Sequence, residues 1–281
     1  MRRIELPDGR VLALEDRGLA YGSPVLFLHP APGSRLLDPD PWSTAGARVW
    51  LLSYDRPGYG VSSPMPDGAV PTIASFADDA AFALDKLRTG PVGAVGWSAG
   101  GLVALALAAR RPDLVRSVAM VATPAHEDEV SRMDDEYREM VDALRPDLPA
   151  AAGVLAQALA PLATSPRSVL DMVGAGPADE SLRNDAVHGP ALRTMAGEAI
   201  RQGVAGIASD IVASTVAPWG FEPGDVTTPV ALWYGEDDEL VTPIHGAWWA
   251  GVLPNADLRI VPGAGHFLPL VAWKQILASV I

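Results

Sequence analysis

The feature that most constrains the fold is a repeated alternation between short apolar runs and longer segments with helical spacing. Apolar runs of this length are typical of strands buried on both faces of a parallel sheet. They occupy residues 25–28, 49–54, 91–95, 115–121, 229–234 and 258–261. Segments 73–87 and 244–252 carry apolar residues at helical spacing. The alternation predicts an α/β fold with a mostly parallel, twisted sheet flanked by helices.

The start of the chain carries a weaker strand signal. Residues 11–16 and 19–22 alternate in polarity and are broken by glycine, which predicts a short hairpin at a sheet edge. The N-terminus is polar and lacks the apolar centre of a signal peptide. The longest apolar stretch, residues 102–109, is far shorter than the roughly 20 residues that span a bilayer. We therefore expect a soluble cytoplasmic protein.

One long stretch interrupts the alternation. Residues 125–216 contain no convincing strand, and helices fit parts of them, such as 129–144 and 153–162. We interpret this stretch as a helical cap inserted between two strands of an α/β core formed by residues 1–124 and 217–281. A chain of 281 residues suits one core domain with such an insertion.

Charge and composition exclude several classes of partner. The net charge of −13 argues against nucleic acid and against an anionic membrane surface, since both attract basic proteins. The absence of cysteine excludes a cysteine nucleophile, a thiolate metal site and disulfides. No pair of histidines has the spacing of metal ligands on a helix face. We expect a small-molecule substrate, no metal and no cofactor, and the oligomeric state cannot be predicted.

A Gly-x-Ser-x-Gly motif lies between a predicted strand and a predicted helix. It reads GWSAG at residues 96–100, with Ser98 at its centre. In this context the serine occupies a strained turn, and side chains at Gly96 and Gly100 would strike the neighbouring strand and helix. The turn would lift Ser98 to the carboxyl edge of the sheet, where the helix N-terminus favours developing negative charge.

Outside residues 125–216, nearly the whole chain resembles the α/β-hydrolase superfamily, specifically its capped serine hydrolases. Besides GWSAG, the motifs that carry the resemblance are HPAP at 29–32, DRPGYG at 55–60, GEDD at 235–238 and GAGH at 263–266. They follow the expected strands in the family's order. The resemblance implies a triad in the order serine, acid, histidine.

A serine hydroxyl needs a base that takes its proton, and a base needs an acid that orients it. Of the five histidines, His266 follows the last predicted strand in a glycine-rich loop that can reach the sheet edge. The resemblance puts the acid three residues after Gly235, at Asp238, and the adjacent Asp237 stays an alternative.

Two backbone N–H groups are needed to bind the oxyanion of the intermediate. One is expected from Ala99, the residue after the nucleophile. The resemblance puts the second at Ala31, two residues after His29. Here Pro30 replaces the glycine that is usual in the family. Proline has no N–H and restricts the loop backbone, but it precedes the expected donor, so the oxyanion hole can survive. We expect His29 to brace this loop.

The residue type of the nucleophile indicates which reaction the enzyme catalyses. Capped relatives such as epoxide hydrolases and haloalkane dehalogenases use an aspartate, whereas Ser98 favours acyl transfer through an acyl-enzyme. Small apolar residues in 125–216, with Met133, Met140, Met172 and Met195, suit an uncharged hydrophobic substrate of small to medium size. We predict cleavage of an ester or a related acyl bond. Open alternatives are a C–C bond hydrolase, an aminopeptidase, a cofactor-free haloperoxidase and a non-catalytic ligand-binding protein.

Overall fold

Eight strands form one sheet in the computed structural model, which describes residues 1–131, 135–161, 163–174 and 176–281. The predicted Met133 lies outside the described residues. The strands are β1 (Arg2–Glu5), β2 (Val11–Gly18), β3 (Ser23–Leu28), β4 (Val49–Tyr54), β5 (Val92–Trp97), β6 (Val115–Val121), β7 (Val230–Gly235) and β8 (Ala256–Val261). Strands β3 to β8 correspond to the six predicted apolar runs.

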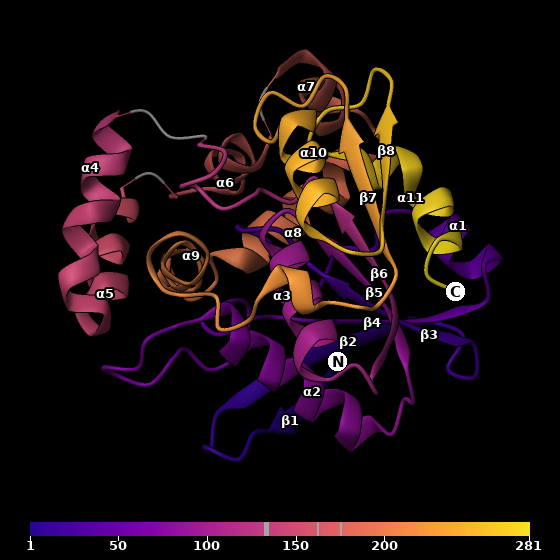
Figure 1. The fold of residues 1–281 in the computed structure, drawn as a ribbon, viewed down its shortest axis with the longest axis horizontal. Coiled ribbons are helices and arrows are strands. Elements are labelled where there is room, and N and C mark those ends of the chain that lie inside the picture. Colours follow the sequence, from indigo (N-terminus) through magenta and orange to yellow (C-terminus); the bar gives the residue numbers. More distant parts are fainter. Residues whose placement is uncertain (132–134, 162, 175) are drawn as a thin grey trace.

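The sheet is mostly parallel, and its strand order is β1-β2-β4-β3-β5-β6-β7-β8 (Figure 1). Among the described strand pairs, only β1–β2 and β2–β4 are antiparallel. The chain runs from β3 to β4 on one side and then returns to place β5 on the other side of β3. The strand order therefore reverses at β3, and open α/β sheets bind ligands at such a point. The α/β fold predicted from the sequence is confirmed.

Helices cover both faces of the sheet, because consecutive strand residues point to opposite sides and both sides are apolar. Leu26 and Leu28 share one apolar cluster with α2 (Ile73–Leu87) and α3 (Ala99–Arg110). Val25 and Phe27 belong to the cluster on the opposite face. The other helices of the sheet domain are α1 (Pro41–Gly46), α10 (Pro243–Val252), α11 (Leu268–Ala278) and the short η3 (Pro223–Asp225).

Between β6 and β7 the described residues form only helices and loops. These are α4 (Asp135–Leu144), η1 (Arg145–Asp147), α5 (Leu148–Leu159), α6 (Pro166–Val173), α7 (Gly176–Asn184), α8 (His188–Ala199), α9 (Ala205–Ile211) and η2 (Val212–Val216). We call α4 to α9 the inserted helices. In Figure 1, α4 and α5 stand far from the sheet, whereas α7 lies beside the carboxyl ends of β7 and β8. The boundaries of a separate cap domain stay a prediction.

The predicted N-terminal hairpin is wrong in its second strand. Strand β2 pairs with β1, in register from Arg2 opposite Leu14 to Glu5 opposite Val11, and not with residues 19–22. Residues 19–22 form the turn into β3. Strand β1 escaped prediction because Ile4 is its only buried residue, so it lacks the alternation that marks a strand.

No helix in the described part of the chain combines the length and the apolar character that crossing a bilayer requires.

Candidate active site

Ser98 lies at a sharp turn between β5 and α3. Its backbone has φ 55° and ψ −125°, a conformation that non-glycine residues rarely adopt and that costs energy to maintain. The backbone N–H of Ser98 donates to the carbonyl of Val121 at the end of β6, at 2.8 Å, which anchors the turn to the neighbouring strand. This is the strained strand-to-helix geometry predicted for the GWSAG motif.

Close packing explains the two glycines of the motif. A Cβ on Gly96 would collide with the backbone of Gly100 and Gly101, on the first turn of α3. A Cβ on Gly100 would collide with the carbonyls of Leu28 and His29. The turn at Ser98 is therefore pressed against the loop that follows β3, where Ala31 lies.

His266 and Asp238 form a hydrogen-bonded pair at the same edge of the sheet. Nδ1 of His266 lies 2.8 Å from Oδ2 of Asp238, and both side chains are fully buried. Because an ionised carboxylate only accepts, Nδ1 carries the proton and Nε2 offers a lone pair. Nε2 is buried, and among the described residues it has no hydrogen-bond partner. This is the tautomer that a general base needs.

Asp238 is held in its charged form. Burial pushes its pKa upward, but His266 and the backbone N–H groups of Val241 and Leu240 outweigh burial and hold the pKa below its ordinary value. These two N–H groups donate to Oδ1 at 2.8 and 2.9 Å. The adjacent Asp237 is exposed. Of the two acids left open by the sequence, only Asp238 is hydrogen-bonded to His266.

Trp97 connects the turn at Ser98 with the loop after β8 that carries His266, which we call the histidine loop. This residue immediately precedes Ser98, and its indole N–H donates to the backbone carbonyl of His266 at 2.9 Å. The two rings lie 5.9 Å apart between centroids. The turn at residue 98 and the imidazole are therefore neighbours, although 169 residues separate Trp97 from His266 in the sequence. Ser98 itself is 7% exposed.

The backbone N–H groups of Ala99 and Ala31 are the two oxyanion donors expected from the sequence. Ala99 is the first residue of α3, where an N–H has no acceptor within its own helix. The N–H of Ala31 points opposite to the carbonyl of Pro30, because the peptide bond between them is planar and trans. That carbonyl accepts from Nδ1 of His29 at 2.7 Å and from Nη2 of Arg56 at 3.0 Å. The direction of the Ala31 N–H is therefore fixed in spite of Pro30.

His29 is a neutral, structural residue. Nδ1 donates to Pro30, and Nε2 accepts from the backbone N–H of Arg56 at 3.4 Å. Burial, and then the charge of Arg56, hold the pKa of His29 well below its ordinary value of 6.5.

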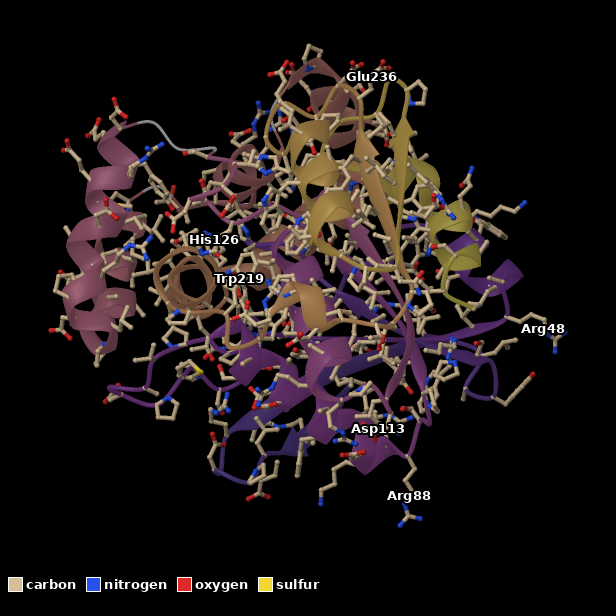
Figure 2. All side chains as sticks on the ribbon, viewed as in Figure 1. Arg48, Arg88, Asp113, His126, Trp219 and Glu236 are labelled. Carbon is tan, nitrogen blue, oxygen red and sulfur yellow. The ribbon has the colours of Figure 1, made fainter. Side chains whose placement is uncertain are left out.

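The remaining histidines lie elsewhere. Nδ1 of His245 accepts from the backbone N–H of Ala125 at 3.1 Å. Nδ1 of His188 lies 2.6 Å from Asp185. Figure 2 shows His126 beside Trp219, with 5.1 Å between the ring centroids. The loop after β7 that carries Asp238 is called the acid loop. Within it, Figure 2 shows Glu236 at the periphery of the molecule, where it is exposed.

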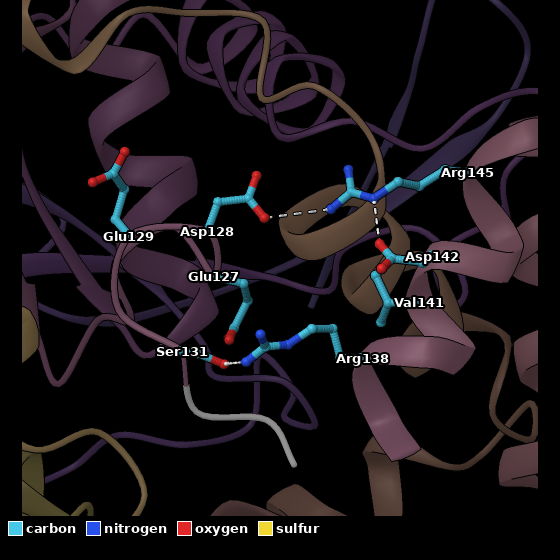
Figure 3. A pocket seen from close by; sticks show the side chains of 8 residues that line it. All are labelled: Glu127, Asp128, Glu129, Ser131, Arg138, Val141, Asp142 and Arg145. Carbon is cyan, nitrogen blue, oxygen red and sulfur yellow. Dashed lines mark hydrogen bonds and ion pairs between the residues drawn. The ribbon is translucent and has the colours of Figure 1, made fainter. Parts of the chain in front are cut away.

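A polar cavity of about 290 Å³ lies between the segment after β6 and helix α4 (Figure 3). Both arginines that line it bind other lining residues: Arg145 lies 3.1 Å from Asp142 and 3.8 Å from Asp128, and Arg138 donates to Ser131 at 2.8 Å. None of the predicted site residues lines it. This cavity is therefore separate from the candidate active site.

Two residues near His266 were not identified from the sequence. Neither Trp97 nor Asp179, on α7, is marked by a sequence signal that indicates a role beside His266. The backbone N–H of Phe267 donates to Oδ1 of Asp179 at 2.8 Å. No local pattern distinguishes Asp179 from the many acidic residues on helix surfaces. Within the described residues, no group of three or more histidine, aspartate or glutamate side chains is arranged to hold a metal ion.

Comparison with known proteins agrees with this geometry. Residues 23–272 match the family model described as the alpha/beta hydrolase fold. The chain is 32% identical over 237 residues to a pimeloyl-[acyl-carrier protein] methyl ester esterase of Chromobacterium violaceum, covering 81% of this chain and 80% of that protein. It is 27% identical over 280 residues to a 2-(acetamidomethylene)succinate hydrolase of Mesorhizobium japonicum, covering 99% of this chain and 93% of that protein.

Solved structures show the same fold. A thermophilic esterase from Thermogutta terrifontis superposes with a TM-score of 0.69 at 23% identity, covering 100% of this chain and 97% of that one. The family model spans most of the chain, and it contains both the serine turn and the Asp238–His266 pair. The chain therefore belongs to the α/β-hydrolase fold family and is an enzyme of that family.

Proposed function

We propose that this enzyme is a serine hydrolase that cleaves a carboxylic ester through an acyl-enzyme on Ser98. The observation that carries the proposal is the buried hydrogen bond between Asp238 and His266, which leaves Nε2 of the imidazole unpaired beside the strained turn at Ser98. A base with this tautomer, next to a serine at a helix N-terminus, is the arrangement that activates a hydroxyl for attack on a carbonyl.

The reaction would proceed in two steps, acylation of Ser98 and hydrolysis of the acyl-enzyme. Oγ of Ser98 attacks the carbonyl carbon while Nε2 of His266 takes its proton, and the N–H groups of Ala99 and Ala31 stabilise the oxyanion. Collapse of the intermediate breaks the ester bond, and the leaving alcohol takes the proton from Nε2. Water then attacks the acyl-enzyme with His266 again as base, which releases the carboxylic acid and regenerates Ser98.

An uncharged, hydrophobic acyl or alcohol group suits the surroundings of the site. Arg56 binds the loop that carries Ala31, and its side-chain N–H groups donate to Asp210 and to the carbonyls of His29 and Pro30. The guanidinium of Arg56 is therefore already paired and is not expected to bind an anionic substrate. The relative from Chromobacterium violaceum is named as a methyl ester esterase, which supports an ester as the scissile bond.

A fluorophosphonate probe tests the nucleophile directly. We expect covalent labelling of Ser98, located by mass spectrometry of the labelled peptide, and turnover of p-nitrophenyl esters of varied acyl length. Ser98→Ala should abolish labelling and lower kcat on the order of 10⁶-fold. Ser181→Ala, which removes an exposed hydroxyl on α7, is the matched control and should behave like the wild type.

Failure of the probe to label the folded wild-type enzyme, together with ester turnover unaffected by Ser98→Ala, would contradict the proposal. The panel should also contain a lactone, an amide and 2-(acetamidomethylene)succinate, because a relative is named as a hydrolase of that compound. A preference for one of these over all esters would keep Ser98 as nucleophile and change the bond that is cleaved.

A further inference from the structure

A second carboxylate, supplied by an inserted helix, lies against the loop that carries His266. Asp179 on α7 is fully buried, and its Oδ1 accepts a hydrogen bond from the backbone N–H of Phe267 at 2.8 Å. The carboxylate also lies near the backbone N–H of His266. This contact joins segments that are 88 residues apart in the sequence. It brings a charged side chain from the inserted helices to the base of the proposed triad.

The last glycine of the GAGH motif makes room for this carboxylate. A Cβ on Gly265 would lie 2.5 Å from Oδ1 of Asp179 and 2.8 Å from its carboxyl carbon. Such a contact is far below van der Waals distance, so any larger residue at position 265 would displace the carboxylate. The proposed catalytic mechanism does not by itself explain why a glycine precedes His266, whereas the position of Asp179 does.

Neighbouring contacts hold α7 against both loops of the site. A Cβ on Gly174 would lie 2.8 Å from the ring of Phe267, and a Cβ on Gly176 would lie 2.9 Å from the carboxyl carbon of Glu239. The end of α6 is therefore packed on the loop that carries His266, and the start of α7 is packed on the loop that carries Asp238. Asp179 does not reach His266 by a chance side-chain orientation, because its helix is itself seated there.

The carboxyl group of Asp179 is less well compensated than that of Asp238. Burial raises its pKa, Asp238 raises it further, and the N–H groups of Phe267 and His266 together with the charge of His266 oppose the rise. Oδ2 is buried, and in the described parts of the chain it has no hydrogen-bond partner. Asp238, from the loop after β7, is hydrogen-bonded to the imidazole, and Asp179, from α7, lies near His266 as well.

We infer that Asp179 is a positioning residue for His266, which fixes the backbone of the histidine loop through Oδ1 and stabilises the imidazolium with its charge. The inference rests on the proposed function, in which His266 becomes an imidazolium whenever Ser98 gives up its proton. A carboxylate near an imidazolium lowers the free energy of that charged state, and a low dielectric strengthens the effect.

Asp179→Asn separates the two parts of this role, because asparagine still offers Oδ1 to Phe267 but carries no charge. We expect kcat for a p-nitrophenyl ester to fall about three- to tenfold with KM unchanged. The acidic limb of the kcat/KM profile should move to lower pH by about half a unit to one unit, since the protonated imidazole loses a stabilising charge. Glu180→Gln removes the same charge from an exposed position on the same helix and should change neither quantity.

Asp179→Ala also releases the loop and should lower kcat about 10²-fold, as expected when a catalytic group loses its alignment. Gly265→Ala should reduce kcat to a similar degree by pushing the carboxylate away. Because both changes break one contact, the double variant Asp179→Ala/Gly265→Ala should lose much less than the product of the two single losses. Independent, multiplicative losses would overturn the link between these two residues.

The inference and the proposed function fail in different ways. If the wild type hydrolyses esters and Asp179→Asn leaves both kcat and the acidic limb unchanged, the inference is wrong and the function stands. If Ser98 is neither labelled nor needed, the function is wrong, and an NMR titration of His266 decides the inference. A midpoint that moves to lower pH in Asp179→Asn but not in Glu180→Gln supports it, and an unmoved midpoint overturns it.

Discussion

At the residue scale, two adjacent aspartates show how burial assigns a role. Asp238 is 2% exposed, whereas Asp237 is exposed to solvent, although both follow the same strand. A buried carboxylate needs compensating partners, and Asp238 finds them in His266 and in two backbone N–H groups. Asp238 in turn holds the imidazole in the tautomer that leaves Nε2 free.

Asp238→Asn is expected to lower kcat about 10⁴-fold, because an amide at this position favours the wrong tautomer of His266. Asp237→Asn removes the same charge one residue away, and its effect should stay within about twofold. Steady-state ester hydrolysis by the two variants measures the difference. Equal losses in both would mean that the acid loop acts through its overall charge and not through the hydrogen bond at Nδ1.

His29 is expected to make folding stability depend on pH. It is neutral in the folded protein, because its pKa lies well below the ordinary 6.5, whereas in the unfolded chain it gains a proton as pH falls below about 6.5. The unfolded state then binds more protons, so the folded state loses stability on acidification. Between pH 7.5 and 5.5 this residue should contribute a loss of about 1.4 kcal/mol.

Urea unfolding of the wild type and of His29→Asn at both pH values isolates that contribution. Asparagine can still donate to the carbonyl of Pro30 but does not titrate. The variant should be less stable at pH 7.5 and should show a smaller decrease on acidification. An identical decrease in both proteins would assign the pH dependence to other groups.

At the scale of elements, buried ion pairs join the loops after β3 and β4 to the inserted helices. Arg56 forms a bidentate pair with Asp210 on α9, with N–O distances of 2.8 and 2.6 Å. Arg35 bonds both Asp55, in the loop after β4, and Glu198 on α8. Because Arg56 also holds the carbonyl of Pro30, the inserted helices help to fix the loop that carries Ala31.

Asp210→Ala is therefore expected to destabilise the protein by about 3–5 kcal/mol, since the buried guanidinium of Arg56 would lose its counter-charge. Tyr59 would also lose the acceptor of its hydroxyl. Asp78→Ala breaks an exposed pair with Arg110 and should cost at most about 1 kcal/mol. Urea unfolding compares the two. A loss as small for Asp210→Ala as for Asp78→Ala would show that the buried pair is dispensable.

At the scale of the whole molecule, the inserted helices share one apolar cluster with the sheet. Phe27 and Trp97 of the sheet and Leu155, Val173 and Met195 of the inserted helices all belong to it. The second cluster lies on the opposite face and is formed mainly by the sheet, α2 and α3. One face of the sheet is thus covered by helices close to it in sequence, and the other depends partly on the insertion.

Much of the fold followed from the sequence because its signals are local. Apolar runs identified the parallel strands, and turn motifs identified the loops at their carboxyl ends. Since parallel strands bring those ends to one edge, the sequence predicts that the loops carrying Ser98, His266 and the acid meet there, and the resemblance to the α/β-hydrolase superfamily puts that acid at Asp238. The strained backbone of Ser98 was likewise predictable, because the glycines that permit it lie within two residues.

Only the tertiary structure decided which polar side chains complete the surroundings of that edge. Asp179 and Asp210 lie on helices whose sequences resemble ordinary half-exposed helices, and their partners are 88 and 154 residues away. Strand β1 pairs through its backbone while most of its side chains are exposed, so hydrophobic periodicity gives no sign of it. Contacts of this kind depend on how separate elements pack against one another. Hydrophobic patterns in a sequence indicate which residues are buried, but they do not indicate which polar side chains meet between distant segments.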